Sequence, residues 1–208
     1  MTRVNPLFLI FFLLLGGLTM NANEKKSSDE YLTYVDEISS AFKQDMKQKF
    51  GLHCYASGGR MPWDVEKIDL SFMSQRHATV EEARRLEVYG VEKLLSLINQ
   101  HEKIRPYLRE YPFKPDRVGL SISFQTKTGE RPLDGSVAHV YATRNMIFYS
   151  KAEIVMTKPH PHTDIRDPNN PKTEMIGGGP EVELLDLLEE PYEDALKIVE
   201  QEKHHDTR

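Results

Sequence analysis

The stretch 79-TVEEARRLEVYGVEKLLSLINQ-100 carries the clearest helical pattern in this chain. Thr79 and Glu82 have capping-box spacing, in which each side chain accepts a hydrogen bond from the other residue's backbone N–H. Apolar residues then recur at helical intervals, at Ala83, Leu86, Val91, Leu94, Leu95 and Ile98. We therefore predict a helix from Thr79 to Gln100 that packs with one face at the centre of the fold, and we place Glu87 on its solvated face.

Gly90 interrupts the apolar face of this helix. A glycine inside a helix costs about 1 kcal/mol relative to alanine. We interpret Gly90 as a place where the helix packs closely against a sheet.

Strand patterns flank the helix on both sides. Ile68, Leu70 and Phe72 alternate with polar residues, and Val118 to Phe124 alternate in the same way. If these two strands are parallel neighbours, the helix is the crossover between them. Residues 137–142 and 146–150 predict a hairpin, which residues 153–156 extend.

Further helices are expected towards both ends. Ser27 and Glu30 have capping-box spacing, and an apolar stripe runs from Val35 to Met46 before Gly51. Near the other end, Pro180 suits a first helical position, and Pro191 is expected to restart the helix. The residues that predict this second helix are Leu184, Leu185, Leu187, Leu188, Ala195, Leu196 and Val199.

The order of these elements predicts an α+β fold, a mostly antiparallel sheet of about four strands covered by helices on one face. We divide the chain into a signal peptide at 1–22 and an α+β body at 23–158. A flexible loop rich in proline and glycine is expected at 159–179, and a C-terminal helical segment that packs on the domain at 180–203.

The first 22 residues resemble a secretory signal. Arg3 precedes an aliphatic and aromatic run from Leu7 to Leu15, and Ala22 is a small residue suited to cleavage. The run is shorter than the roughly 20 residues that span a bilayer, although N-terminal membrane anchoring remains the alternative. We expect an exported protein, periplasmic or secreted, whose mature part is soluble and does not bind the membrane.

Composition narrows the classes of partner. The chain has 27 basic and 32 acidic residues and a net charge of −5, with no dense basic run, which argues against nucleic acid. Cys54 is the single cysteine, so an intramolecular disulfide is impossible. We expect Cys54 to be buried, with an intermolecular bridge as the alternative.

The common catalytic signatures are missing from the sequence, including the Gly-x-Ser-x-Gly elbow, the Walker loop and His-Glu-x-x-His. This favours a non-catalytic binding or interaction domain of the bacterial envelope or extracellular space, with a protein or small ligand as partner. An exported hydrolase or metal-dependent enzyme is the alternative.

One group of residues could hold a metal ion. His160, His162 and Asp164 offer two imidazoles and a carboxylate in an extended segment, a set suited to zinc or copper. Another ligand would have to come from elsewhere, with His139 or His204 possible. The competing interpretation is a hydrophilic loop with incidental histidines and no cofactor.

Other residues suggest an anion site or a contact surface. Ser57, Gly58, Gly59 and Arg60 could offer backbone N–H groups and a guanidinium to an anion, or form a plain turn.

A basic patch could form from Arg76, His77, Arg84 and Arg85, although acidic neighbours favour a mixed-charge surface. We expect the lone Trp63 to anchor a loop, with an exposed contact as the alternative.

Overall fold

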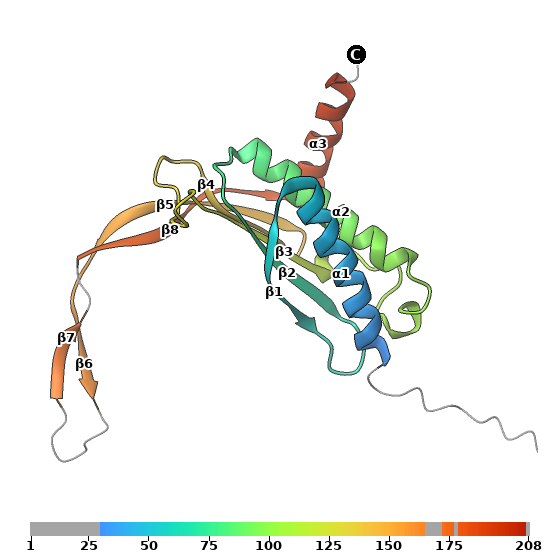
Figure 1. Ribbon diagram of the computed structural model, residues 1–208, viewed down its shortest axis with the longest axis horizontal. Helices are drawn as coiled ribbons and strands as arrows, with labels where there is room; N and C mark the ends of the chain where they lie inside the picture. Colours follow the sequence, from blue (N-terminus) through green and yellow to red (C-terminus); the bar gives the residue numbers. More distant parts are fainter. Residues whose placement is uncertain (1–29, 165–171, 177–178, 207–208) are drawn as a thin grey trace, which may run out of the picture.

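The computed structural model describes residues 30–164, 172–176 and 179–206 (Figure 1). Helices and strands mix in the first half of the chain, and strands dominate the second. The elements are α1 (Glu30–Phe50), β1 (His53–Arg60), β2 (Lys67–Ser74), α2 (Val80–Gln100), η1 (Arg105–Tyr107), η2 (Pro115–Arg117), β3 (Val118–Phe124), β4 (Val137–Thr143), β5 (Met146–Thr157), β6 (His160–Asp164), β7 (Lys172–Ile176), β8 (Gly179–Pro191) and α3 (Tyr192–Asp206).

The main sheet has six strands in the order β1-β2-β3-β4-β5-β8, and β6 and β7 form a separate antiparallel pair. β2 and β3 are parallel, with Ile68 opposite Val118, while the other neighbours in the main sheet are antiparallel. The α+β class is confirmed. The expected sheet of about four mostly antiparallel strands is wrong, because the sheet is mixed and because β1 and β8 were not recognised as strands.

The core lies between the helices and one face of the sheet. Alternate strand residues such as Leu70, Phe72 and Ile122 are buried beneath α1 and α2, and Phe42 of α1 meets Phe72 edge to face with ring centroids 5.6 Å apart. On the other face of the sheet, Ser71 and Ser121 are half-buried and hydrogen-bond to each other. This one-sided burial explains the polar and apolar alternation of β2 and β3.

α2 is the central helix that its sequence predicts. Thr79 Oγ1 accepts from the Glu82 N–H, and Glu82 Oε2 accepts from the Thr79 N–H, so the capping box is complete. At Gly90, a Cβ atom would lie 2.3 Å from Leu120 Cδ2. The interpretation of Gly90 as a close contact between helix and sheet is therefore confirmed.

The prediction of a helix over 180–191 is wrong. This segment forms β8 rather than a helix, and the C-terminal helix begins at Tyr192. Leucines at 184, 185, 187 and 188 fit a helical stripe, but they also fit a strand with a bulge. The register places Leu188 opposite Tyr149 and Asp186 opposite Ser150, so Leu187 is the extra residue.

β5 and β8 extend as a ribbon beyond the rest of the sheet (Figure 1). β4 pairs with β5 only as far as Lys151, whereas β8 continues to Gly179 opposite Thr157. The expected loop at 159–179 contains β6 and β7, with His160 opposite Ile176 and Asp164 opposite Lys172, so part of it is regular strand. Residues 165–171 and 177–178 of that loop lie outside the described residues.

The expected signal segment at 1–22 and Ser27 also lie outside the described residues. Within residues 30–164, 172–176 and 179–206, no helix is long and apolar enough to cross a bilayer. Export therefore stays a prediction from the sequence.

Candidate functional site

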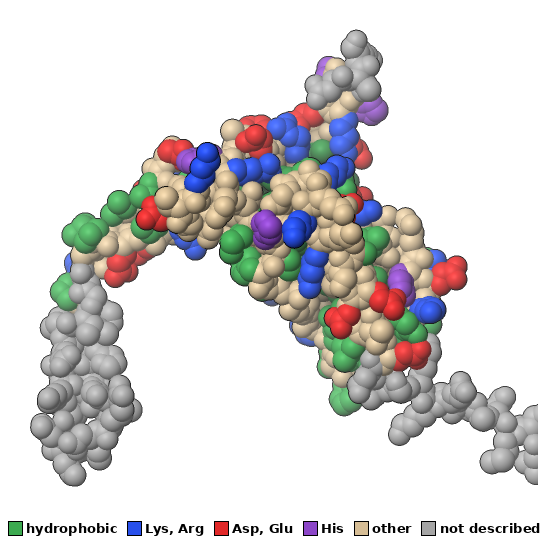
Figure 2. Space-filling model, in the orientation of Figure 1, with side chains coloured by type: hydrophobic (Ala, Val, Ile, Leu, Met, Phe, Trp, Pro, Cys, Tyr) green, Lys and Arg blue, Asp and Glu red, His purple; other side chains and the backbone are tan. Residues whose placement is uncertain are grey.

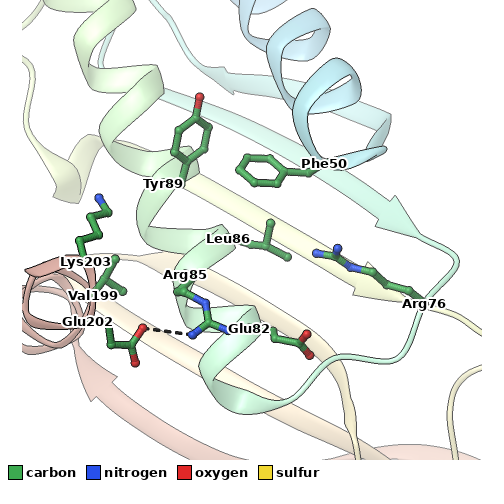
Figure 3. Close-up of a pocket in the computed structure, with 9 residues that line it drawn as sticks. All are labelled: Phe50, Arg76, Glu82, Arg85, Leu86, Tyr89, Val199, Glu202 and Lys203. Carbon is green, nitrogen blue, oxygen red and sulfur yellow. Dashed lines mark hydrogen bonds and ion pairs between the residues drawn. The ribbon is translucent and has the colours of Figure 1, made fainter. Parts of the chain in front are cut away.

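A cleft of about 510 Å³ lies between α2 and α3, close to the C-terminal end of α1 (Figure 3). Tyr192, Ala195 and Val199 pack the first part of α3 into the core. The rest of the helix projects from the body (Figure 1), and Glu202 and Lys203 on it line the cleft. We call this the α2–α3 cleft, and it is lined by Phe50, Arg76, Glu82, Arg85, Leu86, Tyr89, Val199, Glu202 and Lys203.

The floor and one wall of the cleft are apolar. Leu86 and Val199 are buried beneath it, and the rings of Phe50 and Tyr89 meet edge to face, with centroids 4.8 Å apart. The Tyr89 hydroxyl donates a hydrogen bond to Asp45 Oδ2 at 2.8 Å. Partial burial, together with this bond, raises the pKa of Tyr89 to about 12, so its ring carries no charge at neutral pH.

Charged groups surround this apolar surface. Arg85 Nη1 lies 3.2 Å from Glu202 Oε2, and this ion pair ties α2 to α3. Arg76 is exposed and makes no hydrogen bond or ion pair with any residue in the described part of the chain. Its side chain reaches towards Leu86 in Figure 3, and both residues line the cleft.

This arrangement can bind two chemical groups at once. Apolar atoms gain free energy by leaving water, at roughly 25 cal/mol per Å². A guanidinium binds carboxylate or phosphate through charge-assisted hydrogen bonds. The α2–α3 cleft therefore suits a molecule with an apolar body and an anionic group.

A nearly buried polar network holds the α3 wall in position. Arg84 donates to both carboxylate oxygens of Glu190, at 2.7 and 3.1 Å, and the Tyr149 hydroxyl donates to Glu190 Oε1 at 2.6 Å. Tyr192, the first residue of α3, donates from its hydroxyl to Glu92 Oε1 at 2.7 Å. These bonds fix the end of β8 and the start of α3 against α2.

Glu87 is buried, which corrects its placement on the solvated face of α2. It is 0 % exposed, and its Oε1 accepts a hydrogen bond from the Ala142 N–H at 2.7 Å. Oε2 has no partner among the described residues. Burial raises the pKa of Glu87 well above its ordinary value, and the bond from Ala142 opposes this only in part. Glu87 lies four residues after Ala83 and four before Val91, so helical spacing alone could have placed it inside.

The raised pKa of Glu87 predicts a pH effect on stability. Below the ordinary value of 4.5, the carboxyl is protonated in both the folded and the unfolded chain. Above it, only the unfolded chain ionises, so the wild type loses stability as the pH rises towards the folded-state pKa. We expect the Glu87→Gln variant to lack this loss, so urea titrations should show its advantage in unfolding free energy growing from pH 4.5 to 7.

The matched control for this prediction is Glu102→Gln, which neutralises an exposed carboxyl after the end of α2. Its pH profile should follow that of the wild type. A Glu87→Gln profile parallel to the wild type would show that Glu87 ionises in the folded protein as readily as in the unfolded chain.

The expected anion site maps to the outer strand β1 rather than to a turn. Ser57, Gly58, Gly59 and Arg60 pair with β2, and the Ser57 hydroxyl accepts a hydrogen bond from Lys43 Nζ at 3.0 Å. Arg60 forms an ion pair with Glu66. Gly59 and Arg60 line a separate hollow of about 520 Å³ with Lys67, Asp69, Asp116, Arg117, Arg144 and Asn145. The structure thus spreads these four residues along a strand, and anion binding by them stays a prediction.

The expected metal site falls on β6. His160, His162 and Asp164 occupy alternate positions of this strand, and His162 is in register with Glu174 of β7. Their side chains lie outside what the structure describes. His139 interacts with Ser123 Oγ at 3.1 Å, and His204 is exposed on α3. Among the described residues, no group of three or more His, Cys, Asp or Glu could hold a metal ion.

The expected basic patch is divided among several places. Arg84 is buried against Glu190, and His77 lies 2.7 Å from Asp134, whereas Arg76 and Arg85 share the α2–α3 cleft. Arg76 and Arg85 are therefore the only members of this group that line the cleft.

Two further expectations concern single residues. Trp63 is 89 % exposed, so its expected role as a loop anchor is wrong. Cys54 is half-buried rather than buried, and its thiol donates to the Ala56 carbonyl at 3.2 Å.

The α2–α3 cleft thus joins an apolar floor to the guanidinium of Arg76, which has no partner among the described residues. No family model, curated protein or solved structure matches the chain. The function is therefore inferred from the geometry of this cleft.

Proposed function

We propose that this chain is an exported binding protein and that its α2–α3 cleft takes an amphiphilic anion, an aliphatic body with a carboxylate or phosphate group. The observation that carries this proposal is the guanidinium of Arg76, unpaired within the described residues and directed towards Leu86. The pattern of residues 1–22 supports export.

The shape of the cleft supports binding of modest strength. Its volume falls within the range of small-molecule sites, but Arg76, Glu82 and Arg85 are exposed and leave it open to water. An open site buries only part of a ligand, and a flexible ligand loses conformational freedom on binding. We expect dissociation constants on the order of 0.1 mM for a simple amphiphile.

Calorimetric titration with octanoate tests this function. The wild type should bind octanoate more tightly than acetate, which lacks the aliphatic body, and than octyltrimethylammonium, which reverses the charge. Arg76→Gln should weaken octanoate binding by about 5- to 20-fold, because a charge-assisted hydrogen bond at a partly exposed site is lost.

The control variant is Lys127→Gln, which removes one positive charge from an exposed turn outside the cleft. It should bind octanoate within about twofold of the wild type, since distant surface charges are screened by salt. Equal binding by the Arg76→Gln and Lys127→Gln variants, or equal binding of octanoate and octyltrimethylammonium, would refute the proposed site.

A further inference from the structure

β8 has a free edge. It is the last strand of the six-stranded sheet and pairs with β5 on one side, while no strand within the described residues pairs with its other side. The edge is 13 residues long, from Gly179 to Pro191. Free strand edges carry unpaired backbone N–H and C=O groups, which can bind another strand.

The side chains of β8 combine apolar surface with negative charge. Val182, Leu184, Leu187 and Leu188 are 38 to 49 % exposed. The same strand carries four exposed carboxylates that form no ion pair with any described residue, those of Glu181, Glu183, Asp186 and Glu189. Figure 2 shows apolar side chains gathered on the ribbon formed by β5 and β8.

Register separates the two kinds of side chain on the outer half of β8. Val182 lies opposite Ile154, and Leu184 lies opposite Ala152, so these residues share one face of the ribbon. Glu181 and Glu183 occupy the alternate positions and share the other face. A strand added beside residues 181–184 would therefore meet apolar groups on one face and carboxylates on the other.

The negative charge of β8 determines which kind of strand can pair with its edge. A second copy paired through this edge would bring carboxylates against carboxylates, and like charges across a strand pair are destabilising. Acidic residues alone would serve to keep an edge unpaired, but exposed leucines would not. The edge is complementary to a strand in which basic and apolar residues alternate.

We propose that β8 binds an extended segment of a partner protein, with Lys or Arg alternating with apolar residues, as a seventh strand of the sheet. Backbone hydrogen bonds supply affinity, and the alternation supplies specificity. This surface is separate from the α2–α3 cleft, and the proposal does not depend on the ligand of that cleft.

Fluorescence anisotropy with the full chain tests the proposal. The probe is a fluorescein-labelled peptide with the sequence Lys-Val-Lys-Val-Lys-Val, capped at its C-terminus by an amide. It should bind more tightly than Lys-Lys-Lys-Val-Val-Val, which has the same charge without alternation. Peptide with N-methyl groups at alternate backbone positions should lose binding, because it cannot form a strand ladder.

The variant Glu181→Gln/Glu183→Gln should weaken binding of the alternating peptide by about fivefold, as two charge pairs are lost. Its matched control, Glu102→Gln/Glu130→Gln, makes the same charge change at two exposed positions outside β8 and should leave binding unchanged. Equal losses in both variants, or equal binding of both peptide sequences, would overturn the proposal. Self-association of the chain through β8, measured by sedimentation and abolished by Leu184→Lys, would also overturn it in favour of a second copy.

Discussion

Replacing Arg84 by alanine is expected to lower the free energy of unfolding by about 3–5 kcal/mol, the range for breaking a buried ion pair from one side. The Arg84 and Glu190 side chains are only 11 % and 12 % exposed. Without the guanidinium, the Glu190 carboxylate would keep only the Tyr149 hydroxyl as a described partner and would remain largely cut off from water. Urea titration at neutral pH measures the loss.

Arg85 provides the control at the neighbouring position. Its side chain is half exposed, and it pairs with Glu202 at the surface, so Arg85→Ala should cost no more than about 1 kcal/mol. Equal losses for the two arginines would show that the Arg84 pair does not hold β8 against α2. The triple change Arg84→Met, Glu190→Leu and Tyr149→Phe should recover much of the loss, because it leaves no uncompensated charge.

The second large loss of unfolding free energy is expected when Leu94 is truncated. This side chain is fully buried in α2, and truncating it to alanine should cost about 2–5 kcal/mol through lost burial and the cavity left behind. Chemical denaturation should show a lower midpoint for Leu94→Ala, with the slope of the transition unchanged.

Ser96→Ala on the exposed side of the same helix is the control for this prediction. Its hydroxyl accepts a hydrogen bond from Gln100 at the surface, and we expect a change within about 0.5 kcal/mol. A similar loss at Ser96 and Leu94 would mean that the assigned packing face of α2 is wrong.

Local sequence patterns predicted the centre of the fold well. The capping box at Thr79 and the alternation of β2 and β3 are visible within short windows, because each reflects one buried face of one element. These features depend on neighbours in sequence.

The C-terminal segment shows where local patterns fail. The four leucines of β8 suit two periodicities, and pairing with β5 decides between them. That pairing joins residues from Met146 opposite Pro191 to Thr157 opposite Gly179, a contact between strands that are distant in sequence. A window of ten or fifteen residues does not contain this information.

The candidate site was harder to predict for the same reason. The α2–α3 cleft joins Phe50, Arg76 and Val199 from separate parts of the chain. The sequence analysis placed Arg76 and Arg85 in a basic patch together with Arg84. It could not show that Arg84 forms a buried ion pair with Glu190, which is distant in the sequence. Glu87 was missed although its spacing was visible, because a carboxylate is expected in water.

Because β5 and β8 stay paired as far as Thr157 and Gly179, the segment 158–178 between them can be shortened or replaced in an engineered chain. Thr157 and Gly179 face each other in register, so two residues such as Asn-Gly could close the ribbon there as a hairpin. Such a shortened chain would keep every strand of the six-stranded sheet. The far end of the ribbon is thus a natural point for grafting a tag, a loop or a second module onto this scaffold.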